Sequence, residues 1–210
     1  KREISRLVES RYPVLLFDRY FPEMRVNYVI INNEESSYKL VRHLIDKGFR
    51  KIAIITTNPH LLTMDMRREG YANALSDAHI RINPDLYGEV TYVNYQENIY
   101  STMDRIFSAV PDVDAFFFTT HILAIEALRY FYDRGIDIND GNWGLACMHE
   151  DSLFRVLAPK MNIAHFPIEE IGSNAVRILL NQIRQSNDPE AGEYVPESKV
   201  LPCRMEFRDQ

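Results

Sequence analysis

Short β-rich runs alternate with helical patterns along this chain of 210 residues. In a clear example, a strand pattern at 52–56 is followed by a helix pattern at 65–75. Strands separated by helices of ten or more residues form right-handed βαβ units, which build parallel sheets. The alternation therefore predicts an α/β fold with parallel sheets flanked by helices. Further strands are predicted at 14–17, 28–31, 89–93, 115–119, 143–148 and 161–165, further helices at 33–47, 97–109, 122–134 and 168–185, and an extended tail at 199–207.

The net charge and the cysteine content limit the classes of function that are expected of this chain. The formal net charge is −6, so the chain lacks the broad basic surface that nucleic-acid binding needs. Cys147 and Cys203 show no paired spacing and are expected to be buried free thiols in a reducing cytoplasm. No window reaches the length of a membrane span. The chain begins at Lys1 without an initiator Met or a signal region, and we expect it to be a fragment.

The usual catalytic signatures are missing. We find no G-x-G-x-x-G, no G-x-x-x-x-G-K-[ST] and no G-x-S-x-G. His149 and Glu150 begin like H-E-x-x-H, but position 153 is Leu, so the second metal ligand is absent. No catalytic residue, metal site or cofactor is therefore predicted, and the chain is not expected to be an enzyme.

Several segments, in order and over nearly the whole chain, match the sequence motifs of one protein family. Residues 12–19 read YPVLLFDR, like the family strand IPVVLIDR. Residues 43–55 read HLIDKGFRKIAII, like H-L-I-x-x-G-H-x-x-I-A-x-I. Residues 67–75 read RREGYANAL, like R-x-x-G-[FYW]-x-x-A-L. Further matches follow at 111–118, 124–135, 159–172 and 201–208. Together these segments resemble the LacI/GalR family of bacterial transcription regulators.

The resemblance implies the periplasmic binding protein-like type I fold, with two Rossmann-like lobes. Residues 1–48 and 158–187 would form the N-terminal lobe, and residues 49–157 and 188–210 the C-terminal lobe. The family's helix-turn-helix headpiece, its hinge helix and the first part of the N-terminal lobe would lie upstream of Lys1. The N-terminal lobe is therefore expected to be incomplete.

The resemblance also implies a function. A small effector, a sugar or sugar derivative, would bind between the lobes and allosterically change operator binding by the missing headpiece. The expected partners are this effector, operator DNA through the headpiece and a second copy of the chain in a cytoplasmic homodimer; no membrane is expected. The alternative is an exported solute-binding protein for a sugar-like ligand, which a signal peptide upstream of Lys1 would favour. A sugar-metabolising enzyme is a third possibility, which the missing motifs do not support.

The predicted ligand site centres on Arg67, which matches the family arginine that holds ligand hydroxyls or carboxylates. A planar guanidinium suits this role because it can bond two neighbouring oxygens. Thr120 and His121 stand where the family usually has Asn-Asp, and His149 replaces a ligand-binding aspartate. Histidine can donate hydrogen bonds and carry positive charge, so the exchange favours an anionic ligand. The alternative is that His121 and His149 bond only backbone groups.

Four further residues complete the predicted site. Tyr92 and Tyr95 follow a strand where relatives offer a ring to a sugar face, although a core role is equally open. Asp18 and Glu35 would come from the other lobe. Glu35 has a second interpretation, which we prefer, as an acidic residue that favours the dipole of its own helix.

Overall fold

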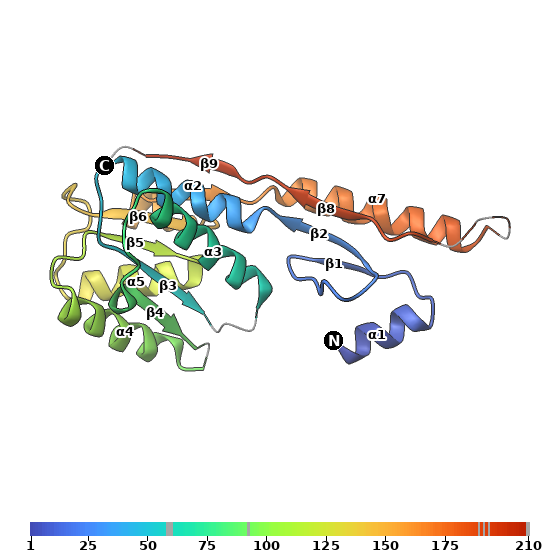
Figure 1. The fold of residues 1–210 in the computed structure, drawn as a ribbon, viewed down its shortest axis with the longest axis horizontal. Helices are drawn as coiled ribbons and strands as arrows, with labels where there is room; N and C mark the ends of the chain where they lie inside the picture. The colour runs from blue at the N-terminus through green and yellow to red at the C-terminus, as the bar shows by residue number, and fades with distance from the viewer. Residues whose placement is uncertain (58–60, 92, 189, 191, 193, 209–210) are drawn as a thin grey trace. The chain divides into compact units, whose positions relative to one another are not determined.

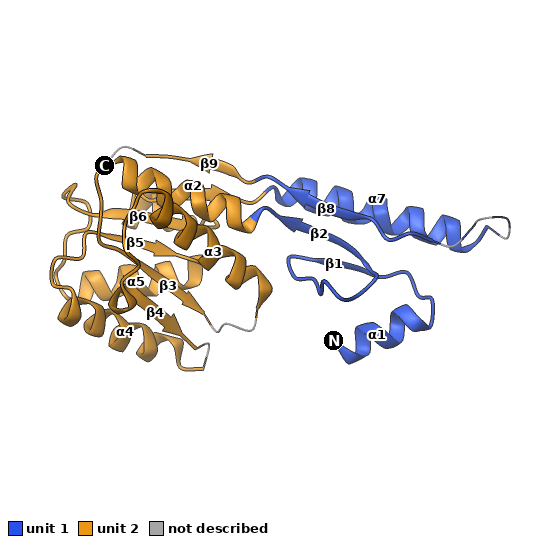
Figure 2. Ribbon diagram, viewed as in Figure 1, with its two compact units in different colours: residues 1–32, 167–202 blue, residues 33–166, 203–210 orange. Residues whose placement is uncertain are grey.

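The computed structural model describes all residues of the chain except 58–60, 92, 189, 191, 193, 209 and 210. It divides into two compact units, coloured separately in Figure 2. Unit 1 comprises residues 1–32 and 167–202, and unit 2 comprises residues 33–166 and 203–210. The chain therefore passes between the units three times, as expected for a protein of two α/β lobes.

Unit 1 is a small α/β unit. It contains α1 (Arg2–Glu9), β1 (Leu15–Phe17), β2 (Asn27–Ile31), α7 (Ile168–Ser186) and β8 (Ser198–Leu201). Its three strands are parallel in the order β1-β2-β8, and α7 packs against them (Figure 1). The core of the unit joins Val29 of β2, Leu201 of β8 and Ile178 of α7. Only one side chain of α7, Ile178, is fully buried, so most of this long helix faces outward.

Unit 2 alternates strands and helices around one sheet. Its elements are α2 (Asn33–Asp46), β3 (Ile52–Thr57), α3 (Leu62–Asp77), β4 (Tyr87–Val90), α4 (Tyr95–Ala109), β5 (Ala115–Phe118), α5 (His121–Asp133), β6 (Gly144–Met148), α6 (Phe154–Leu157), β7 (Asn162–His165) and β9 (Arg204–Glu206). The strand order is β4-β3-β5-β6-β7-β9, with only β9 antiparallel to its neighbour (Figure 1). This confirms the predicted α/β class with parallel sheet.

The run of phenylalanines in β5 shows how both faces of this sheet are covered. Side chains alternate between the two faces of a strand. Phe116 and Phe118 belong to the large core shared with α4 and α5, whereas Phe117 stacks against Tyr71 of α3. All three phenylalanines are fully buried. Near-continuous apolar strands are therefore required here, because helices lie on both faces.

The predicted elements recur with small differences in their ends. Gly48 and Gly135 follow α2 and α5 with φ of 105° and 65°, the left-handed conformation that ends many helices. The strand predicted at 89–93 is β4, which begins two residues earlier, at Tyr87, and ends at Val90, where its pairing with β3 stops. The tail predicted at 199–207 is two strands in different sheets, β8 and β9. They are separated at Pro202, which has no N–H for a ladder.

The unit boundaries differ from the predicted lobe boundaries. Residues 33–46, predicted with the first lobe, form α2, which packs along α3 and against the sheet of unit 2. Residues 158–166 likewise belong to unit 2, because β7 pairs with β6. Residues 188–202, predicted with the second lobe, belong to unit 1 because β8 pairs with β2.

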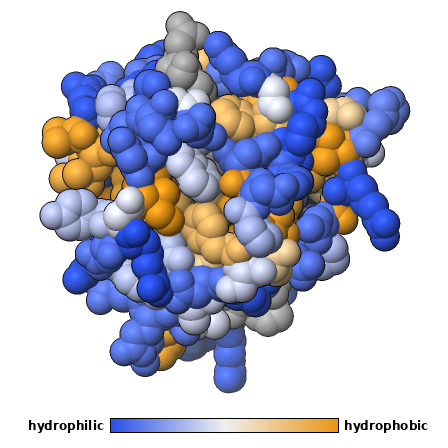
Figure 3. Space-filling model, turned by 90° about the vertical axis from the view of Figure 1, so that its left-hand side faces the viewer, coloured by the Kyte–Doolittle hydropathy of each residue, from blue (hydrophilic) through white to orange (hydrophobic). Residues whose placement is uncertain are grey.

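The surface gives little indication of a broad apolar docking area in the view of Figure 3. Hydrophilic residues cover most of this face, and hydrophobic residues appear in several separate groups. Scattered apolar side chains of this kind are normal on protein surfaces. Among the described residues, no helix is long and apolar enough to cross a bilayer.

Candidate functional site

Arg67 is a buried arginine on α3, and only 4% of its surface is exposed. Its Nε donates to Oδ1 of Asn33 at 2.7 Å, and its Nη1 donates to the backbone oxygen of Thr119 at 2.6 Å. The guanidinium also lies over the ring of Phe166, 5.4 Å from the centroid. These contacts fix a buried positive charge at the carboxyl ends of β5 and β7, where parallel sheets of this type bind ligands.

His121 and His149 form a second part of the site. Their Nδ1 atoms are 3.1 Å apart, so one ring donates a hydrogen bond to the other. His121 is the first residue of α5, and His149 follows β6 with a left-handed φ of 80°. The His149 ring also lies 4.7 Å from the Phe166 ring, centroid to centroid. Phe166 therefore connects the histidine pair with Arg67.

The electrostatics of this site favour a neutral His149. Burial lowers the pKa of His149 below its ordinary value, and the neighbouring His121 and the positive charge of Arg67 lower it further. Asp151 and Glu150 act in the opposite direction with smaller effect. A positive charge on His149 is thus disfavoured mainly because the ring is partly removed from water.

Threonines lie at the carboxyl ends of β3 and β5, and Thr120 directly precedes His121 in the sequence. Thr119 Oγ1 bonds Thr56 Oγ1 at 3.1 Å, which ties the ends of β5 and β3 together. Thr57 Oγ1 and Thr120 Oγ1 are buried and have no hydrogen-bond partner among the described residues. A buried hydroxyl without a partner is costly, so both are candidates for contact with a ligand.

Of the remaining predicted residues, Glu35 and Tyr95 have other contacts within unit 2. Glu35 is exposed in the first turn of α2 and pairs with Lys39 at 2.5 Å. Tyr95 packs against the core shared by α4 and α5. Asp18 lies in unit 1, exposed after β1. Tyr92 lies outside the described residues.

Two residues of the candidate site, Asn33 and Phe166, are not among the ligand-site residues predicted from the sequence. Asn33 was noted only as the start of a helix, and Phe166 lies in a segment of the family resemblance without drawing attention. Each gains its importance from a partner more than 30 residues away, since Asn33 contacts Arg67 across 34 positions. The polar residue at a strand-to-helix junction was the only local signal for Asn33.

Glu150, which the sequence places beside His149, has a different role from a metal ligand. Its Oε2 lies 2.8 Å from Nδ1 of His165, whose Nε2 lies 2.6 Å from Oε2 of Glu206. Arg208 also pairs with Glu206 at 2.6 Å. In the part of the chain that the structure describes, no group of three or more His, Cys, Asp or Glu side chains is placed to hold a metal ion.

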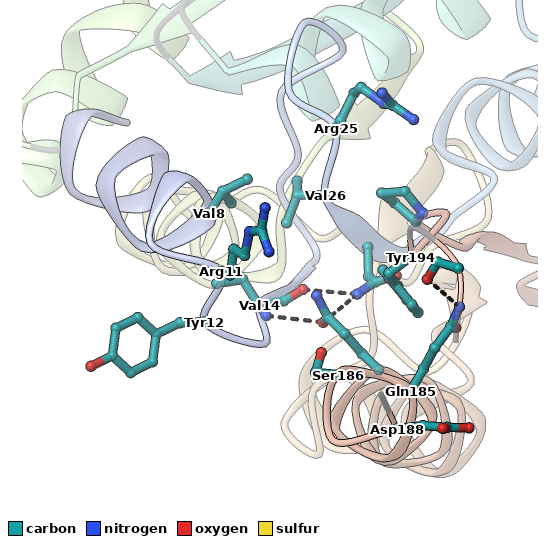
Figure 4. Close-up of a pocket in the computed structure, with 14 residues that line it drawn as sticks. Val8, Arg11, Tyr12, Val14, Arg25, Val26, Gln185, Ser186, Asp188 and Tyr194 are labelled. Atoms are coloured by element: carbon teal, nitrogen blue, oxygen red, sulfur yellow. Dashed lines mark hydrogen bonds between the residues drawn. The ribbon is translucent and has the colours of Figure 1, made fainter. Parts of the chain in front are cut away.

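A cavity of about 690 Å³ in unit 1 contains none of the predicted site residues (Figure 4). Asn27 at its wall donates to the oxygens of Val14 and Gln182 at 3.0 and 2.8 Å, and its Oδ1 accepts from Tyr194 at 2.6 Å. These polar groups bond one another across the wall. Their hydrogen bonds hold α7 and the neighbouring strands together, and we assign no ligand to this cavity.

Residues 41–208 match the model of the periplasmic binding protein-like domain family. The chain therefore belongs to this family, in agreement with its parallel α/β units. Its relatives are transcription regulators of the LacI type. The ribose operon repressor of Haemophilus influenzae is 29% identical over 178 residues, which are 84% of this chain and 52% of the repressor. The chain thus spans about half the length of the curated relatives that it matches.

Solved structures show the same fold. The complex of transcriptional regulator CelR with cellobiose has a TM-score of 0.82 at 23% identity, covering 97% of this chain and 60% of that chain. The Cra transcriptional dual regulator of Pseudomonas putida, in complex with fructose 1-phosphate, has a TM-score of 0.82 at 18% identity. That match covers 100% of this chain and 74% of the Cra chain.

Proposed function

We propose that this chain is the effector-binding domain of a LacI-type transcription regulator, and that its effector is an anionic sugar derivative. The observation that carries the proposal is the buried guanidinium of Arg67, fixed by Asn33 and Thr119 beside the His121–His149 pair. A fixed arginine can form paired hydrogen bonds with a carboxylate or phosphate without losing much side-chain entropy on binding.

The class of ligand follows from the side chains that meet in the site. Arginine offers only hydrogen-bond donors, and histidine can offer donors on one or both ring nitrogens. An anionic group supplies acceptors and offsets the buried positive charge of Arg67. The fructose 1-phosphate in the Cra complex is such a ligand, whereas cellobiose in the CelR complex is neutral. The fold accommodates both classes, and the residues of this chain favour the first.

The regulatory mechanism is a coupling between effector binding and DNA binding in the full-length protein. The effector changes the relative stability of two conformations of the domain, and a DNA-binding part of the protein favours one of them. By reciprocity, operator DNA changes effector affinity by the same factor. We propose that the regulator acts in the bacterial cytoplasm as a homodimer, because two copies match the paired half-sites of an operator.

A thermal-shift screen with matched ligand pairs tests the proposal. The pairs are D-galactose with D-galacturonate and D-fructose with D-fructose 1-phosphate, with D-ribose as a further neutral sugar. We expect a charged member to raise Tm by about 5–10 °C at a concentration near 100 times its Kd. Arg67→Lys should abolish the shift because lysine cannot bond two oxygens in one plane. Arg42→Lys is the control, since Arg42 pairs with Asp46 on the exposed side of α2.

Two results would contradict the proposal in different ways. Stabilisation by the neutral sugars alone would exclude the anionic class and leave the effector-binding function intact. A lack of stabilisation by every compound in the screen would count against a sugar-type effector altogether.

A further inference from the structure

We propose that binding of an anionic effector beside Arg67 adds a proton to the His121–His149 pair, so that affinity for anions rises as the pH falls. This inference rests on the proposed function, because it concerns the same site. It assigns to the two histidines a role in the selectivity of the site for anionic over neutral ligands.

The geometry of the pair allows it to hold one additional proton. The two Nδ1 atoms are 3.1 Å apart, and a hydrogen bond at this distance needs one ring to donate and the other to accept. Adding a proton at a distal Nε2 makes the donating ring an imidazolium and keeps the hydrogen bond, which becomes charge-assisted. Adding a second proton would leave two donors facing each other, so the hydrogen-bonded pair has room for one extra proton and not two.

The position of the pair connects it to the anion site. His149 lies against Phe166, and the guanidinium of Arg67 lies over the same ring. His121 begins α5, a helix of 13 residues whose first N–H groups carry partial positive charge. Beside it, Thr120 Oγ1 is buried without a partner among the described residues. These donors lie around the pair and would all favour negative charge.

The charges that face His149 determine the sign of the effect. From other elements these are His121 on α5 and Arg67 on α3, and from its own loop they are Glu150 and Asp151. Burial, His121 and the positive charge of Arg67 keep its pKa low. An anion adds a negative charge near Arg67, which cancels part of this repulsion and raises the pKa of His149. Since bound anion favours the proton, bound proton equally favours the anion.

Sulfate is a suitable probe because it stays a dianion between about pH 6 and about pH 8, where histidine titrates. We would measure its Kd by calorimetry at both pH values, with sodium chloride at matched ionic strength as reference because sulfate also stabilises proteins nonspecifically. We expect binding to be about 2- to 5-fold tighter at the lower pH, because a proton on the pair adds a positive charge beside the anion. Repeating the titration in two buffers of different ionisation enthalpy should show net proton uptake.

His149→Asn tests whether the pair is responsible. Asparagine tolerates the left-handed φ of 80° found at His149 and cannot take a proton. We expect this variant to bind sulfate with a Kd that no longer depends on pH. His79→Asn is the matched control, because His79 is exposed after α3 and also has a left-handed φ, of 55°. Should His149→Asn not fold, His121→Asn removes the same pair, and proton uptake by the unaltered protein remains measurable.

The possible outcomes separate this inference from the proposed function. Sulfate binding that does not depend on pH, or that keeps its pH dependence in the pair variants, would overturn the inference and leave the site in place. Binding of neutral sugars without sulfate binding would also overturn it, with the effector function intact. If neither sulfate nor any sugar binds, both proposals fail together.

Discussion

Gly70 of α3 lies directly against the backbone of Glu34 in α2. A Cβ atom at position 70 would overlap the Glu34 carbonyl oxygen and would come within 2.9 Å of Ser37 Cβ. The missing side chain lets the two helices approach closely, and Asn33 at the start of α2 then reaches Arg67 at 2.7 Å. The glycine therefore supports the site indirectly, through helix packing.

Gly70→Ala should lower the free energy of unfolding by about 1–3 kcal/mol, because the methyl group meets backbone that cannot move without separating the helices. Urea denaturation would measure the change. Gly172→Ala in α7 is the control, since a Cβ there has nothing within 4 Å, and alanine should stabilise this helix by about 0.5–1 kcal/mol. If the two substitutions changed the free energy of unfolding equally, the close contact between α2 and α3 at Gly70 would not be important for stability.

Asn33→Ala should cost about 1.5–3 kcal/mol of stability and weaken ligand binding. The substitution removes the acceptor for Arg67 Nε in a fully buried setting, and a charged donor left without a partner is expensive. Denaturant unfolding and the ligand screen would measure the two effects. Asn73→Ala, which removes an exposed hydrogen bond to Glu34, should change stability by less than about 0.5 kcal/mol. If Asn73→Ala lowered the stability as much as Asn33→Ala, the hydrogen bond between Asn33 and Arg67 would not have the importance assigned to it.

The stability of the unliganded protein should depend on His149 at mildly acidic pH. Its pKa in the folded state lies below the ordinary value of 6.5, mainly because of burial. As the pH falls through 6.5, the unfolded chain takes up a proton before the folded protein does, so stability is full above this pH and decreases below it. His149→Asn should make the fall in stability between about pH 7 and about pH 5 shallower. An unchanged slope, measured beside His79→Asn, would argue against a buried neutral His149.

Both cysteines should resist alkylation in the native protein. Cys147 is fully buried and Cys203 is 9% exposed, and burial raises the pKa of each thiol. Because the thiolate is the reactive form, iodoacetamide should modify neither quickly at mildly alkaline pH, and Cys203 should react before Cys147. Mass spectrometry over time would show this order. Rapid modification of Cys147 in the folded state would mean that the core around β6 opens readily.

The elements of the fold could be predicted because their signals are local. Apolar runs such as Phe116–Phe118 and glycines such as Gly48 act within a few residues of themselves, and the structure confirms both. The membership of α2 could not be predicted in this way. Its apolar stripe requires a partner surface, but the pattern does not say whether that surface lies in unit 1 or unit 2.

The candidate site could be predicted to the extent that its residues fall on motifs of the family resemblance. Arg67, His121 and His149 were selected from the resemblance. In the structure Arg67 and His149 contact the Phe166 ring, and His121 contacts His149. The hydrogen bond between the two histidines could not be foreseen, because 28 residues separate them and its geometry depends on the left-handed backbone of His149.

The sequence by itself determined the alternation of strands and helices, the parallel α/β class, the buried thiols and the family motif that contains Arg67. The first three follow from periodicity and composition, and the motif that contains Arg67 comes from the family resemblance; all of them are properties of short segments. Only the tertiary structure decided that Gly70 admits α2, that Asn33 and Thr119 fix the guanidinium of Arg67, and that His121 meets His149. Such contacts depend on the relative placement of whole helices and strands, which close packing sets to within fractions of an ångström.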